Sequence, residues 1–172
     1  MSQSGVITFK GNPLTLAGEA VTAGQSPDFT LHKFGPDGLG TIKPGDLKGK
    51  PTLLNVVPSL DTPVCATQTK KFSEQLAELG DKINAVTVSM DTPFAQNRFC
   101  GAENIENLQN GSDYMDHNFG KSFGVWIEEL GILTRAVIVL DSDAKVVYSE
   151  IVPEVTNEPN YDAALEALKG QL

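Results

Sequence analysis

Three runs of mostly apolar residues stand out along the chain and predict strands that are buried on both faces. They span residues 52–57, 83–89 and 136–140. None of them shows the strict polar alternation of a strand with one face in water. Residues 145–151 follow the third run after an Asp-rich turn, so they are predicted to return as its antiparallel partner. The chain therefore has the material for a sheet with a buried centre.

Apolar residues at helical spacing predict helices between and after these strands. Residues 69–79 carry apolar side chains three or four positions apart, and Gly80 ends the segment. A threonine–proline pair at 92–93 is typical of an N-cap and first helical position, so a second helix is expected over 93–101. A terminal helix is expected over 161–168. Strands alternating with helices indicate an α/β layer fold with helices on both faces of a sheet, without fixing the strand order.

Weaker patterns predict shorter elements around this framework. An N-terminal β-hairpin of about residues 5–17 is expected, because two apolar runs flank the turn residues 11–13. The other expected elements are a short strand within 29–34, a turn-rich segment at 35–40, a helical turn at 44–47, a short strand at 105–109 and a short helix at 116–123. No internal repeat appears, and a single domain of residues 1–172 accommodates the whole chain.

Composition narrows the class of protein. Apolar residues make up 40%, and the formal net charge is −9, so disorder and binding to nucleic acid are disfavoured. No apolar run is long enough to cross a bilayer, and residues 1–11 lack the pattern of a signal peptide. These features predict a cytoplasmic protein. Its 2 cysteines suffice for one redox pair, and in a reducing cytoplasm such a pair is more often redox-active than structural.

Cys65 lies where a reactive thiol would be placed. The segment from Pro58 to Cys65 joins a predicted buried strand to a predicted helix, so Cys65 falls near the helix start. Free backbone N–H groups and partial positive charge at a helix N-terminus stabilise a thiolate. The Thr62 hydroxyl is one turn away and could contact the sulfur or a bound oxygen. The alternative is that Cys65 is simply a small buried apolar residue.

Three segments together resemble a known family. Pro58-x-x-x-Thr62-x-x-Cys65 matches the active-site motif of the peroxiredoxins, and residues 58–68 (PSLDTPVCATQ) resemble their thiol peroxidase branch. Residues 91–101 (DTPFAQNRFCG) resemble the segment that holds the resolving cysteine of that branch. Residues 134–141 (TRAVIVLD) resemble the strand that bears the family's arginine. The resemblance covers nearly the whole chain.

This resemblance implies a thioredoxin-like fold, a central mixed sheet flanked by helices, and a homodimeric peroxidase acting on hydrogen peroxide and organic hydroperoxides. Cys65 would be the peroxidatic cysteine, which forms a sulfenic acid, with Thr62, Pro58 and Arg135 around it. Cys100 would resolve this acid as an intramolecular Cys65–Cys100 disulfide, with thioredoxin as the usual reductant. The family pattern suggests an arginine where this chain has Met115.

These residue types suit the reduction of a peroxide by a thiolate. When a thiolate breaks an O–O bond, negative charge moves from sulfur to the leaving oxygen, and fixed donors stabilise that movement. Arginine suits the task because its planar group stays charged and holds two acceptors. Without the resemblance, Arg135 would be interpreted as a surface residue and Cys100 as a buried structural thiol. A thiol close to the sulfenic acid prevents irreversible oxidation.

Other kinds of site are not indicated. The chain has no close ligand pair of metal-finger type, no Cys-x-x-Cys and no glycine-rich phosphate loop, so no metal or cofactor is expected. Asp61 and Asp91 are interpreted as turn or capping residues. Two alternatives stay open: a cysteine hydrolase using His32 or His117 as base, and a non-enzymatic redox sensor switched by the same disulfide.

Overall fold

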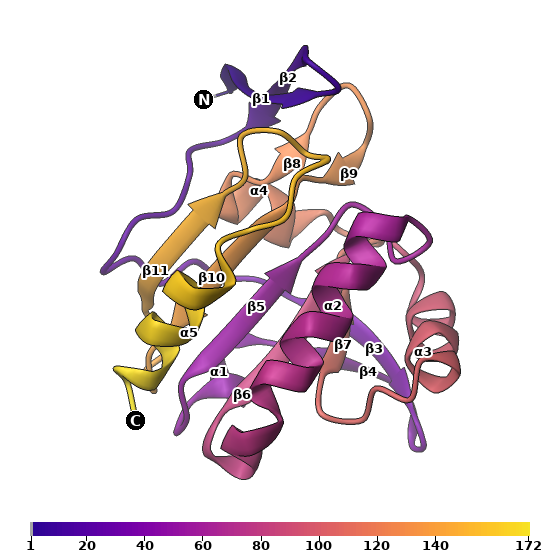
Figure 1. The fold of residues 1–172 in the computed structure, drawn as a ribbon, viewed down its shortest axis with the longest axis vertical. Coiled ribbons are helices and arrows are strands. Elements are labelled where there is room, and N and C mark those ends of the chain that lie inside the picture. Colours follow the sequence, from indigo (N-terminus) through magenta and orange to yellow (C-terminus); the bar gives the residue numbers. More distant parts are fainter. Residues whose placement is uncertain (1) are drawn as a thin grey trace.

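A computed structural model describes residues 2–172 as two β-sheets with helices packed around the larger one (Figure 1). The strands are β1 (Gln3–Phe9), β2 (Asn12–Ala17), β3 (Leu31–Gly35), β4 (Gly38–Ile42), β5 (Thr52–Val56), β6 (Asn84–Ser89), β7 (Gln109–Ser112), β8 (Trp126–Ile127), β9 (Ile132–Leu133), β10 (Ala136–Leu140) and β11 (Val146–Ile151). The helices are α1 (Pro44–Leu47), α2 (Pro63–Leu76), the 3-10 helix η1 (Ala77–Lys82), α3 (Pro93–Ala102), α4 (Asn118–Phe123) and α5 (Tyr161–Lys169).

The larger sheet is mixed and has seven strands in the order β11-β10-β5-β6-β7-β3-β4. Strands β5, β6 and β7 run parallel, and the remaining pairs are antiparallel. The predicted buried strands, β5, β6 and β10, lie at its centre. The C-terminal ends of β5 and β6 lie at the same end of the sheet, and α2 and α3 follow them in the chain. In α/β folds, functional sites lie at the C-terminal ends of the parallel strands.

Side chains on alternate positions of the strands divide the core into two layers. Leu53 and Val137 face the layer that contains α2, α5 and part of α3. Their neighbours Leu54 and Ile138 face the opposite layer, where α1 and α4 pack. Figure 1 shows α2 and α5 across the near face of the sheet, with α3 beside its edge. Helices on both faces explain why these strands carry apolar residues without alternation.

The smaller sheet confirms the predicted hairpin and connects it to the rest of the chain. Its order is β1-β2-β8-β9, all antiparallel. The chain near Thr8 also pairs with the segment after β11: the Thr8 amide donates to Pro153 O at 2.8 Å, and Thr8 O accepts from the Val155 amide at 2.9 Å. The hairpin is therefore attached to residues 153–155 as well as to β8.

Several local predictions are wrong. The strand expected at 105–109 is β7, which begins only at Gln109; Ile105 and Leu108 are buried outside any strand. The segment at 35–40 is not all turn, because β4 begins at Gly38 and pairs with β3. The short strands β8 and β9 were not predicted. Within residues 2–172 no helix is long and apolar enough to span a membrane.

Candidate active site

The first turn of α2 holds Cys65. Thr62 is the N-cap in extended conformation and Pro63 is the first helical residue. The first helical backbone bond runs from the Ala66 amide to Thr62 O at 3.0 Å, so the Cys65 amide precedes it and belongs to the unpaired N–H groups of a helix start. Proline at this position has no N–H to leave unpaired. The sulfur thus lies at the positive end of a helix of 14 residues.

The Cys65 side chain is fully buried in a small apolar cluster of its own. The cluster contains Val57, Leu60 and Cys65, and the half-buried ring of Phe99 packs against it. Because these neighbours are apolar, the electrostatic influence of any charged group that reaches the sulfur is weakly screened.

Arg135 is that charged group. It lies directly before β10 and is only 2% exposed, which contradicts its interpretation as a surface residue. Its guanidinium donates to Cys65 Sγ at 3.4 Å and to Gln68 Oε1 at 2.8 Å, and its Nε donates to Val155 O at 2.8 Å. Three acceptors, two on α2 and one in the segment after β11, therefore fix one nitrogen against the sulfur. The planar geometry of arginine makes this arrangement possible.

A buried polar network behind Arg135 was not recognised from the sequence. Gln68 Nε2 donates to Asn55 Oδ1 at 2.7 Å, and Asn55 Nδ2 donates to Thr69 Oγ1 at 3.0 Å and Thr87 Oγ1 at 3.2 Å. Gln68 follows Cys65 by three positions, so both lie on one face of α2. The available signal was Asn55, a polar residue inside an otherwise apolar strand run. The network orients Gln68 and, through it, Arg135.

Pro58 and Thr62 lie at the wall of a pocket above this site. The pocket has a volume of about 380 Å³ and is lined by Phe9, Pro58, Ser59, Thr62, Pro63, Val64, Leu130, Ile132, Arg135, Val155 and Thr156. The Thr62 hydroxyl donates to Ser59 O at 2.8 Å, so it does not donate to the sulfur here, and its oxygen is left as an acceptor. An O–H group entering the pocket could donate to it.

Cys100 lies apart from this site. It is a free thiol, as Cys65 is, and it packs near the end of α3 in the core layer that contains α2 and α5. Burial raises the pKa of Cys100, and its hydrogen bond with Asn110 only partly offsets this. The adjacent Phe99 packs against the clusters of both cysteines. In this structure Cys100 is therefore a protonated, buried thiol at neutral pH.

Comparison with known proteins identifies the family of the chain. The Redoxin family model matches residues 22–165. The chain is 50% identical over 164 residues to a thiol peroxidase of Bacillus subtilis, covering 95% of this chain and 96% of that one. It is 47% identical to the thiol peroxidase of Staphylococcus haemolyticus, covering 95% and 97%. The chain belongs to the peroxiredoxins, in their thiol peroxidase branch. It is a peroxiredoxin-type peroxidase that reduces peroxide at the expense of thiols.

Solved structures agree with the fold of this peroxiredoxin. A peroxiredoxin-like protein from Aquifex aeolicus superposes with a TM-score of 0.86 at 40% identity, covering 96% of each chain. A thiol peroxidase from Chromobacterium violaceum gives a TM-score of 0.83 at 19% identity, covering 95% of each chain. The expected thioredoxin-like α/β fold with a central mixed sheet is confirmed.

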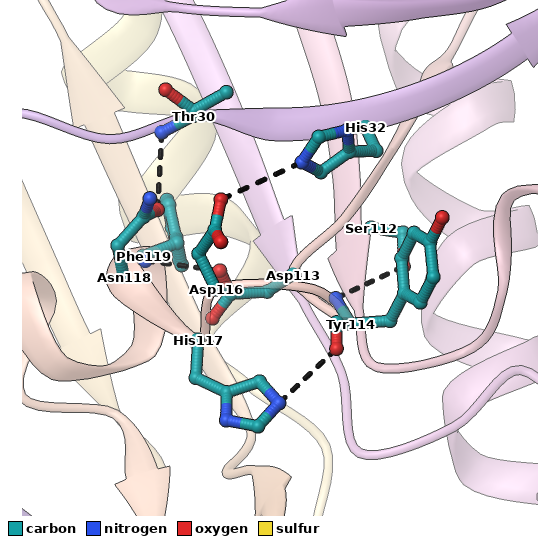
Figure 2. Close-up of polar contacts among 9 residues, drawn as sticks. All are labelled: Thr30, His32, Ser112, Asp113, Tyr114, Asp116, His117, Asn118 and Phe119. Carbon is teal, nitrogen blue, oxygen red and sulfur yellow. Dashed lines mark hydrogen bonds and ion pairs between the residues drawn. The ribbon is translucent and has the colours of Figure 1, made fainter.

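Met115, where the resemblance suggested an arginine, lies in a turn before α4. Its side chain is 56% exposed. Beside it, the buried Asp113 carboxylate accepts the amides of Phe119 and Gly120 at 3.0 and 2.8 Å, and burial raises its pKa despite these bonds. Figure 2 shows how this turn packs against the strand that carries His32. The turn is thus held by Asp113 and not by residue 115.

Both histidines belong to this turn region and not to the Cys65 site. His32 Nε2 lies 3.8 Å from an Asp116 oxygen, and His117 Nε2 lies 3.1 Å from Tyr114 O (Figure 2). The His117 ring also stacks on Trp126. The group that contacts Cys65 Sγ is a guanidinium, which cannot serve as a base. The geometry therefore does not support a cysteine hydrolase. Within residues 2–172 no three His, Cys, Asp or Glu side chains converge as metal ligands would.

Proposed function

We propose that Cys65 is the peroxidatic cysteine of this thiol peroxidase and that Cys100 resolves it. The observation that carries the proposal is the 3.4 Å contact between the Arg135 guanidinium and Cys65 Sγ at the start of α2. A fixed cation and a helix N-terminus both stabilise negative charge on sulfur, and the thiolate is the nucleophile.

In the first step the Cys65 thiolate attacks one peroxide oxygen. The S–O bond forms as the O–O bond breaks, and the leaving oxygen departs as water or an alcohol once protonated. Arg135 is placed to follow the charge as it moves from sulfur to oxygen. Thr62 Oγ1, whose own proton is directed to Ser59 O, is available to accept the O–H of the bound hydroperoxide.

The pocket walls suggest which hydroperoxides fit. Phe9, Leu130 and Val155 contribute apolar surface to the pocket that Thr62 and Arg135 also line. Such walls bury the carbon chain of an organic hydroperoxide, whereas hydrogen peroxide gains nothing from them. We infer that both are reduced and that the apolar walls favour organic hydroperoxides.

In the second step the Cys100 thiol gives up its proton and its sulfur attacks the sulfenic sulfur of Cys65. The S–S bond forms, the S–O bond breaks, and the oxygen takes up that proton and leaves as water. The two thiols are free and belong to separate apolar clusters. A disulfide requires Cα atoms within about 7 Å. We therefore propose that the end of α3 opens locally so that Cys100 reaches Cys65.

Membership in the family implies a peroxide substrate and a reductant of the thioredoxin type. We propose thioredoxin itself as the reductant, the cytoplasm as the place of action and a homodimer as the assembly. Support for a dimer comes from the exposed pair Phe34 and Phe94, whose ring centroids lie 5.1 Å apart. Sedimentation of the purified chain tests the assembly.

The test of the residue roles uses two serine variants with thioredoxin, its reductase and NADPH. Cys65→Ser is expected to abolish turnover, since a serine hydroxyl is scarcely ionised at neutral pH. Cys100→Ser is expected to reduce about one peroxide per chain and then accumulate over-oxidised Cys65, read by intact mass. Appreciable peroxidase activity in Cys65→Ser would falsify the assignment. If the protein were a redox sensor and not an enzyme, the wild type would be oxidised by peroxide but would not reduce peroxide repeatedly in this assay.

A further inference from the structure

Asp91 connects the loop before Cys65 to the helix that carries Cys100. It follows β6 and lies two residues before the start of α3. Its carboxylate accepts the Ser59 hydroxyl at 2.7 Å and the Leu60 amide at 2.8 Å. Both donors lie between Pro58 and Cys65, and Leu60 is a member of the apolar cluster around the Cys65 sulfur.

On the side of β6, β7 and α3, the groups that bind Asp91 are buried. The Asp91 carboxylate also accepts the Ser89 hydroxyl at 2.7 Å, and Asp91 O accepts the Ser112 hydroxyl at 2.6 Å. Gln96, in the first turns of α3, donates from Nε2 to Ser89 Oγ at 2.9 Å and to Gly111 O at 3.0 Å. Ser89, Gln96 and Ser112 are fully buried. Asp91 is thus fixed through both its main chain and its side chain. The N-terminal part of α3, here called the base of α3, is bound to the same network through Gln96.

We propose that Asp91 is a positioning residue that latches the loop before Cys65 to the base of α3. This rests on the proposed roles of the two cysteines. With the latch closed, the loop and the first turn of α2 are held in the arrangement that reacts with peroxide. When its hydrogen bonds to Ser59 and Leu60 break, the loop and α3 move independently, as disulfide formation requires.

The latch therefore influences two competing fates of the Cys65 sulfenic acid. In disulfide formation, Cys100 sulfur displaces the oxygen, the S–O bond breaks and water leaves. In over-oxidation, the sulfenate attacks a second hydroperoxide, a new S–O bond forms, the O–O bond breaks, and sulfinate and water or alcohol result. The first fate needs the open arrangement and the second needs the closed one. Weakening the latch is expected to favour the disulfide.

Asp91→Asn tests this with little change in volume. Asparagine is neutral and has one acceptor oxygen in place of two, so the Leu60 amide and the Ser89 hydroxyl can be kept only through weaker, uncharged bonds. The Ser59 hydroxyl can no longer donate to this side chain at the position of Oδ1. Asp61→Asn is the matched control, because it removes the same charge from the exposed side chain of the same loop. Each protein is treated with graded hydrogen peroxide in the presence of thioredoxin, its reductase and NADPH. Intact mass then gives the fraction of sulfinic acid.

We expect the peroxide concentration for half over-oxidation to rise about tenfold in Asp91→Asn, the shift expected from losing one charge-assisted hydrogen bond. The rate of the first oxidation of Cys65 should fall, and Asp61→Asn should match the wild type. A lower Tm with unchanged partition and unchanged first oxidation would mean a merely structural role and would overturn the proposal.

Ser59→Ala keeps the test decisive if Asp91→Asn does not fold, because it removes only one donor to the carboxylate. It should shift the partition in the same direction by a smaller factor, and a wild-type partition would refute the latch. Failure of the latch is distinguishable from failure of the cysteine assignments. In the first case the wild type still forms the Cys65–Cys100 disulfide, whereas in the second it forms none.

Discussion

Replacing Arg135 with methionine removes the guanidinium that contacts the Cys65 sulfur. Two unit charges 3.4 Å apart attract by roughly 5 kcal/mol at an effective dielectric constant of about 20. Only the part that differs between ground state and transition state affects the rate. The loss of one comparable donor costs about 3–4 kcal/mol. Arg135→Met should therefore slow oxidation of Cys65 by ~10²–10³-fold.

The measurement is rapid-quench oxidation of Cys65 in a Cys100→Ser background, with alkylation of the remaining thiol and detection by mass. Arg135→Lys is the control that keeps the charge. A lysine ammonium cannot reproduce the fork that holds Cys65, Gln68 and Val155 together, so it should recover only part of the rate. A folded Arg135→Met protein that reacts within about threefold of the Cys100→Ser parent would refute the reasoning, because such a change is far below the loss of one donor.

Three further predictions test other parts of the structure. Burial raises the pKa of Cys100 above its ordinary value of 9.0, so the free energy of unfolding of the reduced protein should fall as pH rises above about 9, where the Cys100 thiol ionises in the unfolded chain first. Denaturation series should show a shallower fall just above pH 9 in Cys100→Ser. Hydrogen bonds, first from Thr8, lower the pKa of Glu154 to about 2, so its contribution to stability is present above about pH 4.5 and is lost as pH falls toward 2; Glu154→Gln should show a smaller acid-dependent loss of Tm. A Cβ on Gly124 would lie 2.3 Å from Glu19 O, whereas one on Gly131, also at positive φ, would have only a contact at 4.0 Å. Gly131→Ala should therefore lower the free energy of unfolding by about 1–2 kcal/mol, and Gly124→Ala should lower it clearly more. Equal urea midpoints of the two variants would contradict this.

The sequence was informative where one segment determines the local structure. The Thr62–Pro63 pair starts α2 in the structure, so the place of Cys65 in a first helical turn could be predicted from neighbouring residues alone. The same holds for Thr92, whose hydroxyl accepts the Ala95 amide at 3.3 Å as an N-cap. N-caps and first-turn prolines act within a few residues, and pattern analysis recovers such short-range effects.

Features that depend on distant partners could not be predicted in the same way. β7 has the polar sequence QNGS, and it is a strand because it lies between β6 and β3, with Gln96 satisfying Gly111 O. Apolar pattern instead favoured the preceding residues, Ile105 and Leu108, which fill the core from a loop. The burial of Arg135 likewise depends on Gln68 and Val155, and nothing adjacent to it in sequence indicates those contacts.

The spacing of the groups around Cys65 has a consequence for the chain during its synthesis. Arg135 lies 70 positions after Cys65, and the Val155 carbonyl that holds it lies 20 positions further on. At roughly 5–20 residues per second, translation takes several seconds to cover that interval. Until then the nascent chain carries Cys65 without its cation. A growing chain that meets peroxide therefore presents an ordinary thiol, and the reactive site is assembled only when the protein is almost complete.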